Sequence, residues 1–570
     1  MHTIARRLSF LLAGAAACVL VSAAGAQEAA KPSFEPEASA PEAAPVPESP
    51  TAGQAAPAPA ASPAAEQTSQ PSPQSEPPAQ PATPLAHLIK DKLASPPSGA
   101  DEQAAKEFAA LTAFYEARAF TPVWVSETGP LKRSADVIAA LEGANAYGLE
   151  ASDFDVPALE GVTDPEKLAA GEIALTRTAL LYARHARGGR IMKPPEMLNS
   201  NLDRKPQLID PRIVLDGLAG ADNPGTYLTA THPKHPQFEK LRQAFLTAGG
   251  AEAKGDERRS LSTGAKRIRA NMEMWRWMWE DMGELYVFNN IPEFMQYVYR
   301  DGEVIRAEKI VAGMIDKQSS IFSRHLKHVV LRPQWRVPES IMVHELWPSL
   351  LRGGGLMRQY GLQIQTKDGR VLDWRKIDWA HDDIRNYHVM QPPGPKSVLG
   401  VVKFSFPSQH TIFMHDTPDK WMFRSAQRTH SHGCLRVWKP VELAEILLAY
   451  DKGWDKAKVA ELIRSGPLDN EVEIDKRIPI HLVYFTAWVD DKGKMRAFAD
   501  VYGHERRIIQ ALDGDWSKIA KGRDHLAPPQ PKFNPKAVAS SPGGTPATQR
   551  KKSAQTTGDL LSDVFGGLSF

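Results

Sequence analysis

The strongest constraint on the fold of this chain is a change in hydrophobic periodicity near Gly283. From Leu85 to about Gly250, apolar residues recur three or four positions apart, for example across residues 137–144 and 174–183, which is the spacing of one helix face. Beyond Gly283, short alternating or continuous apolar runs replace that spacing. The sequence therefore predicts a multidomain α+β protein, with a helical module first and a β-rich module second.

The β-rich module is indicated by short runs of β-branched and aromatic residues with turn residues between them. The first three runs are typical of hairpin-linked strands, because Asp301 and Gly302 stand between the second and the third. Further runs extend the expected sheet to about residue 505. The runs are residues 286–288, 294–299, 304–311, 398–406, 411–414 and 480–488.

Two other segments have unusual compositions. Residues 267–282 hold three tryptophans and four methionines close together, and large apolar residues on several faces of one helix favour burial between two modules over a ligand-binding surface. Residues 338–385 contain a triple glycine, several tryptophans and little clean periodicity. We expect this second segment to be an inserted flap rather than a core element.

Both ends of the chain are biased in composition. Residues 27–84 are dominated by Pro, Ala, Glu, Ser and Gln, and residues 527–570 by Pro, Ser, Thr and Lys. Such segments carry too little apolar surface to offset the entropy of ordering. We therefore expect a disordered linker and a disordered tail, although residues 560–565 could form a short docking helix.

The N-terminus is typical of a cleavable secretory signal peptide covering residues 1–26. Two arginines precede an apolar run from Leu8 to Ala24, and the small-residue site Ala24-Gly25-Ala26 follows. Cleavage after Ala26 would also remove Cys18. No later stretch approaches the roughly 20 apolar residues that span a bilayer, so we expect a soluble periplasmic protein with no membrane span after signal removal.

The charge of the chain gives no reason to expect a nucleic-acid partner. The formal net charge is +2 and 24% of residues are charged, which is not the basic balance of a nucleic-acid-binding protein.

After signal removal one cysteine remains, Cys434, so no internal disulfide can form. A catalytic thiol needs an imidazole to take its proton, and His415 lies upstream at the end of an expected strand, with 18 residues (416–433) between it and Cys434. Gly433 would let the backbone turn sharply and present amides to a developing oxyanion. The alternative is that Cys434 is a small buried hydrophobe, the usual fate of a free cysteine.

The run Ser431-His-Gly-Cys-Leu-Arg436, with His415 upstream, closely resembles the signature of the YkuD-type L,D-transpeptidases of the bacterial cell wall. The resemblance implies that Cys434 is the nucleophile and His415 the general base, oriented by backbone groups. It also implies that Ser431, His432 and Gly433 line the site, with the role of the His432 side chain left open. Arg436 is either a partner for a substrate carboxylate or a structural ion-pair partner.

Other segments resemble the large periplasmic branch of that family: residues 114–125, 187–190, 393–407 and 484–488. The resemblance implies a helical scaffold domain over 85–283, a catalytic domain over 284–510 and a substrate-capping subdomain over about 338–385. Relatives in that branch usually carry a peptidoglycan-binding module in the scaffold. The corresponding stretch here, about 235–266, is too short to hold one.

The implied activity is a cofactor-free, metal-free acyl transfer on peptidoglycan stem peptides. Cys434 would attack the diaminopimelate–D-alanine bond of a tetrapeptide stem, and a diaminopimelate amine would then take the acyl group to give a 3-3 cross-link. An outer-membrane protein or water could replace that acceptor, and carbapenems would be expected to trap the thiolate. Two alternatives from other classes remain open: a zinc peptidase using His415, His430 and His432, and a catalytically silent wall-binding scaffold.

Overall fold

The structure is a computed structural model that describes residues 81–95, 101–253 and 259–540. The predicted signal peptide, nearly all of the predicted linker and residues 541–570 of the predicted tail, including its docking helix, lie outside the described residues. Among the residues that are described, none of the helices combines the length and the apolar character that crossing a membrane requires.

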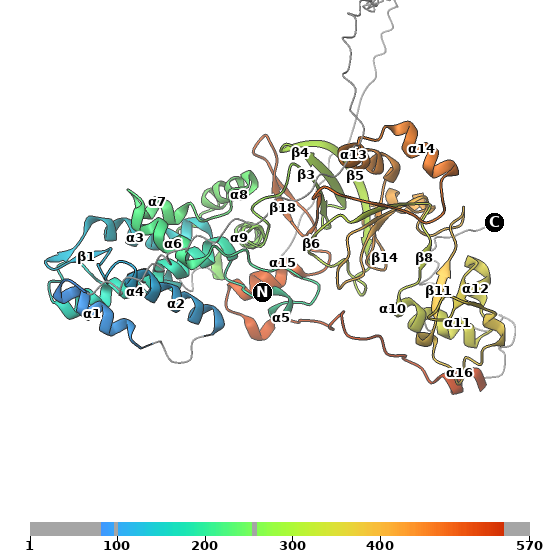
Figure 1. The fold of residues 1–570 in the computed structure, drawn as a ribbon, viewed down its shortest axis with the longest axis horizontal. Helices are drawn as coiled ribbons and strands as arrows, with labels where there is room; N and C mark the ends of the chain where they lie inside the picture. The colour runs from blue at the N-terminus through green and yellow to red at the C-terminus, as the bar shows by residue number, and fades with distance from the viewer. Residues whose placement is uncertain (1–80, 96–100, 254–258, 541–570) are drawn as a thin grey trace, which may run out of the picture. The chain divides into compact units, whose positions relative to one another are not determined.

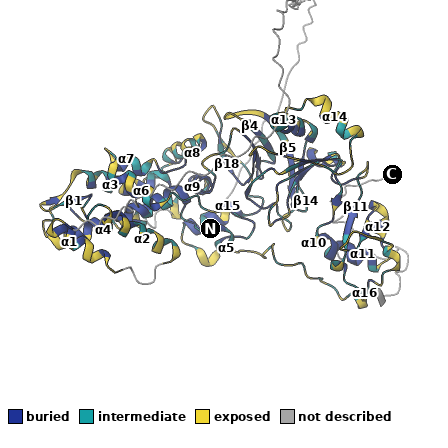
Figure 2. Ribbon diagram, viewed as in Figure 1, coloured by how far each residue is buried: buried dark blue, intermediate teal, exposed yellow. Residues whose placement is uncertain are grey.

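The first part of the described chain is helical, as the periodicity predicts. Helices α1–α4, α6 and α7 bury one apolar core around the 24-residue helix α4, in which Leu175, Ala179 and Tyr182 are fully inaccessible, whereas the apolar residues of α8 and α9 join the core of the β-rich part. Figures 1 and 2 show the arrangement and the burial of these helices. The helices are α1 (Pro84–Leu93), α2 (Glu102–Glu116), α3 (Lys132–Glu142), α4 (Pro165–Gly188), α5 (Pro194–Met197), α6 (Pro211–Gly220), α7 (Pro224–Thr229), α8 (Pro236–Thr247) and α9 (Thr263–Arg276), with a short hairpin of β1 (Val125–Ser126) and β2 (Gly129–Pro130).

Capping residues and prolines define where these helices begin. Asp164 caps α4 by accepting a hydrogen bond from the Lys167 N–H, and Pro165 follows at the first helical position, where a missing N–H costs nothing. Of the stretch 235–266, the structure describes residues 235–253 and 259–266, which include α8 and the start of α9.

The Trp- and Met-rich segment is buried, as its composition predicts. Trp275 and Trp277 are almost fully inaccessible. Trp275 stacks on His235 at 4.2 Å, on the scaffold side, and on Phe485 at 4.4 Å, on the catalytic side. The tryptophans of α9 thus join the helical part to the β-rich part.

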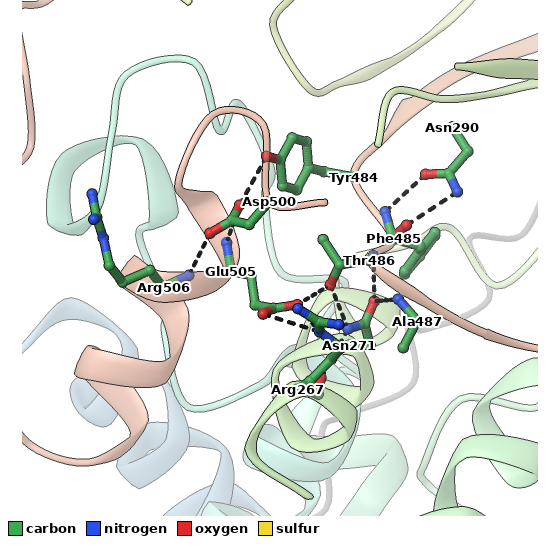
Figure 3. A network of polar contacts seen from close by, with 10 residues as sticks. All are labelled: Arg267, Asn271, Asn290, Tyr484, Phe485, Thr486, Ala487, Asp500, Glu505 and Arg506. Carbon is green, nitrogen blue, oxygen red and sulfur yellow. Dashed lines mark hydrogen bonds and ion pairs between the residues drawn. The ribbon is translucent and has the colours of Figure 1, made fainter. Parts of the chain in front are cut away.

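A buried polar network fixes α9 against the chain after β17, and Figure 3 shows its contacts. The Asn271 carboxamide accepts hydrogen bonds from the backbone N–H groups of Thr486 (2.9 Å) and Ala487 (3.1 Å) and donates to the Thr486 hydroxyl at 2.9 Å. Glu505 accepts from the same hydroxyl and pairs with Arg267 at 2.9 Å. Because buried polar groups must be satisfied, this set specifies one docking geometry.

The β-rich part is built on one long path of strands in the order β16-β7-β12-β13-β15-β5-β4-β3-β17-β6, with β14 paired to β5. β3, β4 and β5 are the antiparallel hairpins that the sequence predicts, and β17 joins β3 in parallel. The strands are β3 (Leu285–Asn290), β4 (Met295–Arg300), β5 (Glu303–Gly313), β6 (Ser323–His325), β7 (His328–Leu331), β12 (Val402–Ser405), β13 (Met414–His415), β14 (Thr429–Ser431), β15 (Leu435–Val437), β16 (Asn470–Glu473) and β17 (Pro479–Val483), with a separate hairpin of β18 (Ala487–Val489) and β19 (Met495–Ala497).

The expected flap is a folded subdomain, which we call the cap (residues 335–391). It has its own apolar core, including Trp347 and Ile364, and its own sheet in the order β10-β9-β11-β8. The cap thus includes the expected flap of about residues 338–385, extends beyond it to β8 and β11, and has regular elements. The elements are β8 (Trp335–Arg336), α10 (Glu339–Ile341), a π-helical turn η4 (Met342–Leu346), α11 (Trp347–Leu351), α12 (Gly355–Tyr360), β9 (Gln363–Gln365), β10 (Val371–Leu372) and β11 (His388–Gln391).

The C-terminal segment, defined here as residues 513–540, continues beyond the last helices of the catalytic part. Those helices are α13 (Pro440–Lys452), α14 (Lys456–Ser465) and α15 (His504–Leu512). Figure 1 shows the segment running from α15 to α16 (Pro535–Ser540), which lies against α11 of the cap. Phe533 meets Trp347 edge-on at 5.6 Å. Of the predicted tail, residues 527–540 thus follow a defined path.

We predict that Asn271→Ala lowers the free energy of unfolding by roughly 2 to 4 kcal/mol, because two buried N–H groups, of Thr486 and Ala487, lose their acceptor. Urea denaturation followed by fluorescence measures this. Arg506→Ala is the control, since Arg506 joins the network of Figure 3 only through its backbone N–H to Asp500. Equal stability of the two variants would contradict the role given to Asn271.

Candidate functional site

The two candidate catalytic residues lie at or next to the ends of neighbouring parallel strands: His415 ends β13, and Cys434 directly precedes β15. Met414 of β13 pairs with Leu435 of β15, and both side chains are fully buried in the core. His415 pairs with Arg436, two residues after Cys434. The backbones at the two candidate residues therefore lie diagonally across this strand pairing.

The turn before the nucleophile is held by serines. Ser431, which the sequence placed in the site lining, is buried, and its hydroxyl donates to the Cys434 carbonyl at 2.6 Å and accepts from the Gly433 N–H at 3.2 Å. Ser319 donates to the Gly433 carbonyl at 2.7 Å. Since the C=O and N–H of a trans peptide point in opposite directions, this anchor turns the Cys434 N–H away from Ser319.

Gly433 is required by the geometry of this turn. Its φ is +114°, a value that side-chain-bearing residues rarely adopt, and an added Cβ would lie 3.3 Å from the carbonyl oxygen of Gln318. The expected sharp turn at this position is present.

His415 is oriented by a backbone group. Its Nδ1 lies 2.5 Å from the Asp416 carbonyl oxygen, and because a carbonyl only accepts, Nδ1 carries the hydrogen and Nε2 is left as the basic atom. Burial, and secondarily the charge of Arg436, lowers the pKa of His415 to about 3. The imidazole is thus neutral at physiological pH.

Cys434 is also neutral in this resting arrangement. Its side chain is partly exposed, and the thiol donates a long hydrogen bond to the Thr411 carbonyl, with Sγ 3.9 Å from the oxygen. Burial raises the pKa of Cys434 to about 11. The site therefore holds a thiol beside an imidazole and not a preformed ion pair.

Arg436 lies on the same face as Cys434 but is buried. Its guanidinium contacts the Met422 sulfur of the loop that joins β13 to β14. Its charge also helps to lower the pKa of His415 and opposes the rise in the pKa of Asp419 to about 6, which burial causes. In this structure Arg436 is a structural cation beneath the site, and a substrate carboxylate would need a rearrangement to reach it.

The side chain of His432 joins the catalytic turn to the cap. Its Nε2 lies 2.8 Å from the Glu345 carboxylate, which comes from the π-helical turn of the cap, and Lys317 contacts both groups. Burial would raise the pKa of the Glu345 carboxyl, but the hydrogen bond and charge of His432, with the charge of Lys317, hold it below its ordinary value. Glu345 and Lys317 carried no sequence signal, because each stands about 90 or more residues from Cys434.

The three histidines of the zinc hypothesis have separate partners. His415 bonds Asp416, His432 bonds Glu345, and the His430 ring lies 5.6 Å from that of Trp421. Within residues 81–95, 101–253 and 259–540, no group of three or more His, Cys, Asp or Glu side chains is arranged to share a metal ion. This arrangement gives the zinc hypothesis no support.

A cavity of about 980 Å³ lies away from this site, between scaffold residues such as Arg187 and Tyr227 and catalytic-part residues such as Arg477 and Pro479. Neither His415 nor Cys434 lines it. The chemistry of the thiol and imidazole, rather than cavity size, therefore defines the candidate active site.

Comparisons with known proteins agree with this fold. Residues 284–460 match the family model of the YkuD L,D-transpeptidase catalytic domain, and residues 109–245 match that of the scaffold domain. The chain therefore contains a YkuD L,D-transpeptidase catalytic domain behind a scaffold domain, which confirms the resemblance seen in the sequence.

Individual relatives match only parts of this chain. A putative L,D-transpeptidase from Haemophilus influenzae is 31% identical over 236 residues, which are 41% of this chain and 47% of that protein. The chain thus spans about half the length of this curated relative. A solved L,D-transpeptidase from Mycobacterium smegmatis is 13% identical over 35% of this chain and 58% of its own, with a TM-score of 0.16, which is too low to support any inference.

We predict that Glu345→Ala loosens the cap, because it removes the carboxylate that His432 and Lys317 share. Amide hydrogen exchange over residues 342–351 should quicken by about tenfold or more while global unfolding changes little. Glu339→Ala, an exposed change in the same subdomain, is the matched control. Identical exchange in the two variants would show that this contact does not hold the cap.

Proposed function

We propose that this protein is a peptidoglycan L,D-transpeptidase that uses Cys434 as nucleophile and His415 as general base. The observation that supports the proposal is the parallel pairing of β13 with β15, in which His415 is the partner of Arg436, two residues after Cys434. The catalytic-domain match over residues 284–460 supports the substrate class. We place its activity outside the cytoplasm, in the periplasm, where that substrate lies.

The first step forms an acyl-enzyme. His415 Nε2 takes the thiol proton as Sγ attacks the carbonyl of diaminopimelate, the third residue of a donor tetrapeptide. The C–S bond forms and the C–N bond to the terminal D-alanine breaks. The imidazolium gives its proton to the departing amine. D-alanine therefore leaves with an uncharged amino group, and His415 returns to its basic form.

The second step transfers the acyl group. The side-chain amine of diaminopimelate on an acceptor stem attacks the thioester and loses a proton to His415. The C–S bond breaks, Cys434 recovers that proton, and a 3-3 cross-link results. The Cys434 N–H, directed by the Ser319–Gly433 hydrogen bond, is our candidate donor to the oxyanion in both steps.

Other acceptors use the same acyl-enzyme. An outer-membrane protein as acceptor would make the enzyme an anchor of such proteins to the wall, and water would make it an L,D-carboxypeptidase. Incubation with a disaccharide tetrapeptide, followed by mass analysis, distinguishes them: a cross-linked dimer supports transpeptidation, and a tripeptide alone supports hydrolysis.

A carbapenem should acylate the purified protein once, giving a single covalent adduct in intact-mass spectrometry. Cys434→Ala should abolish the adduct, because the β-lactam carbonyl needs the sulfur nucleophile. His415→Ala should slow acylation roughly 100- to 10,000-fold near neutral pH, the usual contribution of a positioned base. An adduct that survives Cys434→Ala would remove the assignment.

The pH dependence of acylation should be flat between about pH 5 and 9. His415, with a pKa of about 3, stays basic throughout this range, and Cys434, with a pKa of about 11, stays a thiol, so neither group titrates. In His415→Ala the rate should instead rise with pH as hydroxide or thiolate takes over. An acid limb centred near pH 6.5 in the wild type would mean that the imidazole titrates normally.

A further inference from the structure

The C-terminal segment reaches the loop that precedes His415. His525 lies against His410, with the two rings stacked at 4.9 Å and 20° and with His525 Nε2 2.7 Å from His410 Nδ1. On its far side, His410 Nε2 lies 2.9 Å from the Asp203 carboxylate. His525 Nδ1 is 2.8 Å from the Ser200 hydroxyl. Residues from three distant parts of the chain therefore meet here.

With a neutral His410, one assignment of hydrogens satisfies these contacts. Asp203 only accepts, so His410 carries its hydrogen on Nε2 and offers Nδ1 as an acceptor. His525 then donates from Nε2 to His410, with the Ser320 hydroxyl as a second neighbour of that nitrogen at 3.2 Å, and its Nδ1 accepts from Ser200. Burial lowers the pKa of His525 to about 4, which agrees with a neutral His525 ring. The contact with His525 thus helps to hold the plane of the His410 ring.

His410 holds the loop that contacts the nucleophile. The next residue, Thr411, has a φ of +52°, a strained value for a β-branched residue, so the surrounding contacts must hold it there. The Thr411 carbonyl is the group that accepts the hydrogen bond from Cys434 Sγ. The direction of the resting thiol therefore depends on a loop whose buried anchor is His410.

We propose that His525 is a positioning residue for the transfer reaction: through His410 it sets the backbone of residues 408–411 and hence the orientation of Cys434. The inference rests on the proposed function. The C-terminal segment would thus contribute to the active site. Without the His525 hydrogen bond, His410 can turn, Thr411 can relax toward an unstrained conformation, and the thiol loses its fixed direction relative to His415.

The variants are chosen to separate the hydrogen bond from packing. His525→Phe keeps an aromatic ring against His410 but cannot donate, and His525→Gln restores a donor near the position of Nε2. Leu526→Ala, at an exposed neighbouring position, is the matched control. Each full-length variant is treated with a carbapenem, and the acylation rate constant and the inhibitor's binding constant are measured separately, with thermal unfolding as a record of the fold.

His525→Phe should lower the acylation rate constant about tenfold or more, since misplacing a reacting group by an ångström costs up to about a hundredfold, while the binding constant stays within about twofold. His525→Gln should recover most of the rate, and Leu526→Ala should match the wild type. If His525→Phe does not fold, the comparison of His525→Gln with His525→Leu gives the same test. A rate constant that is unchanged without the donor, or a loss seen only in binding, overturns the proposal.

A double-mutant cycle tests the route through His410. His410→Phe and His525→Phe should each slow acylation, and the double variant should be no slower than the worse single variant, because both remove one interaction. If the double variant instead slows acylation by the product of the two single effects, the proposed coupling between His410 and His525 is overturned. Wild-type acylation at Cys434 separates the two proposals: if it is absent the proposed function fails, and if it is present but insensitive to His525 only this inference fails.

Discussion

The parallel pairing of β13 with β15 is the interaction on which the candidate site depends. One face of this pair carries Met414 and Leu435 into the apolar core, so a slip of one residue would put polar side chains such as His415 and Arg436 in their place. The hydrophobic constraint that forms the sheet therefore also sets which residues of β15 lie opposite His415. The remaining contacts of the candidate site refine the orientation of its side chains.

That refinement comes from residues far away in the sequence. Ser319 anchors the Gly433 carbonyl, and Tyr502 donates to the Gly313 carbonyl at 2.6 Å and accepts from the Ser319 N–H at 3.3 Å. The Tyr502 N–H in turn donates to the Tyr484 hydroxyl, which belongs to the network of Figure 3 that holds α9. A continuous series of polar contacts thus links the junction with the scaffold to the turn before the nucleophile. The scaffold domain contributes to the rigidity of the catalytic turn without touching it.

The sequence predicts the parts of this protein that depend on local periodicity or on a short motif. Helical spacing identified the scaffold, the hairpins β3–β5 followed from alternation and turn residues, and the roles expected of Cys434 and His415 came from residue chemistry together with the resemblance to a known motif. A capping segment was expected from the same resemblance. Its internal elements were not predicted, because its helices are three to six residues long and include a π-helical turn, which is too short for a period to show. The sequence analysis did not find the roles of Lys317, Ser319 and Glu345. These roles arise only when segments distant in the chain become neighbours, and an isolated polar residue in a sequence does not indicate its partner.

The neutral resting state of the thiol suits the place where we propose that the enzyme works. Thiolates, not thiols, react with disulfides and oxidants, so a lone cysteine with a depressed pKa would be modified readily in an oxidising compartment. Cys434 has the opposite character: burial raises its pKa to about 11, and the Thr411 carbonyl, whose oxygen carries partial negative charge, opposes ionisation further. In the proposed reaction, the proton moves to His415 only when a carbonyl carbon is in place to accept the electrons of sulfur. The contacts that keep the thiol protonated at rest and those that direct it during attack are then the same ones, made by the loop of residues 408–411.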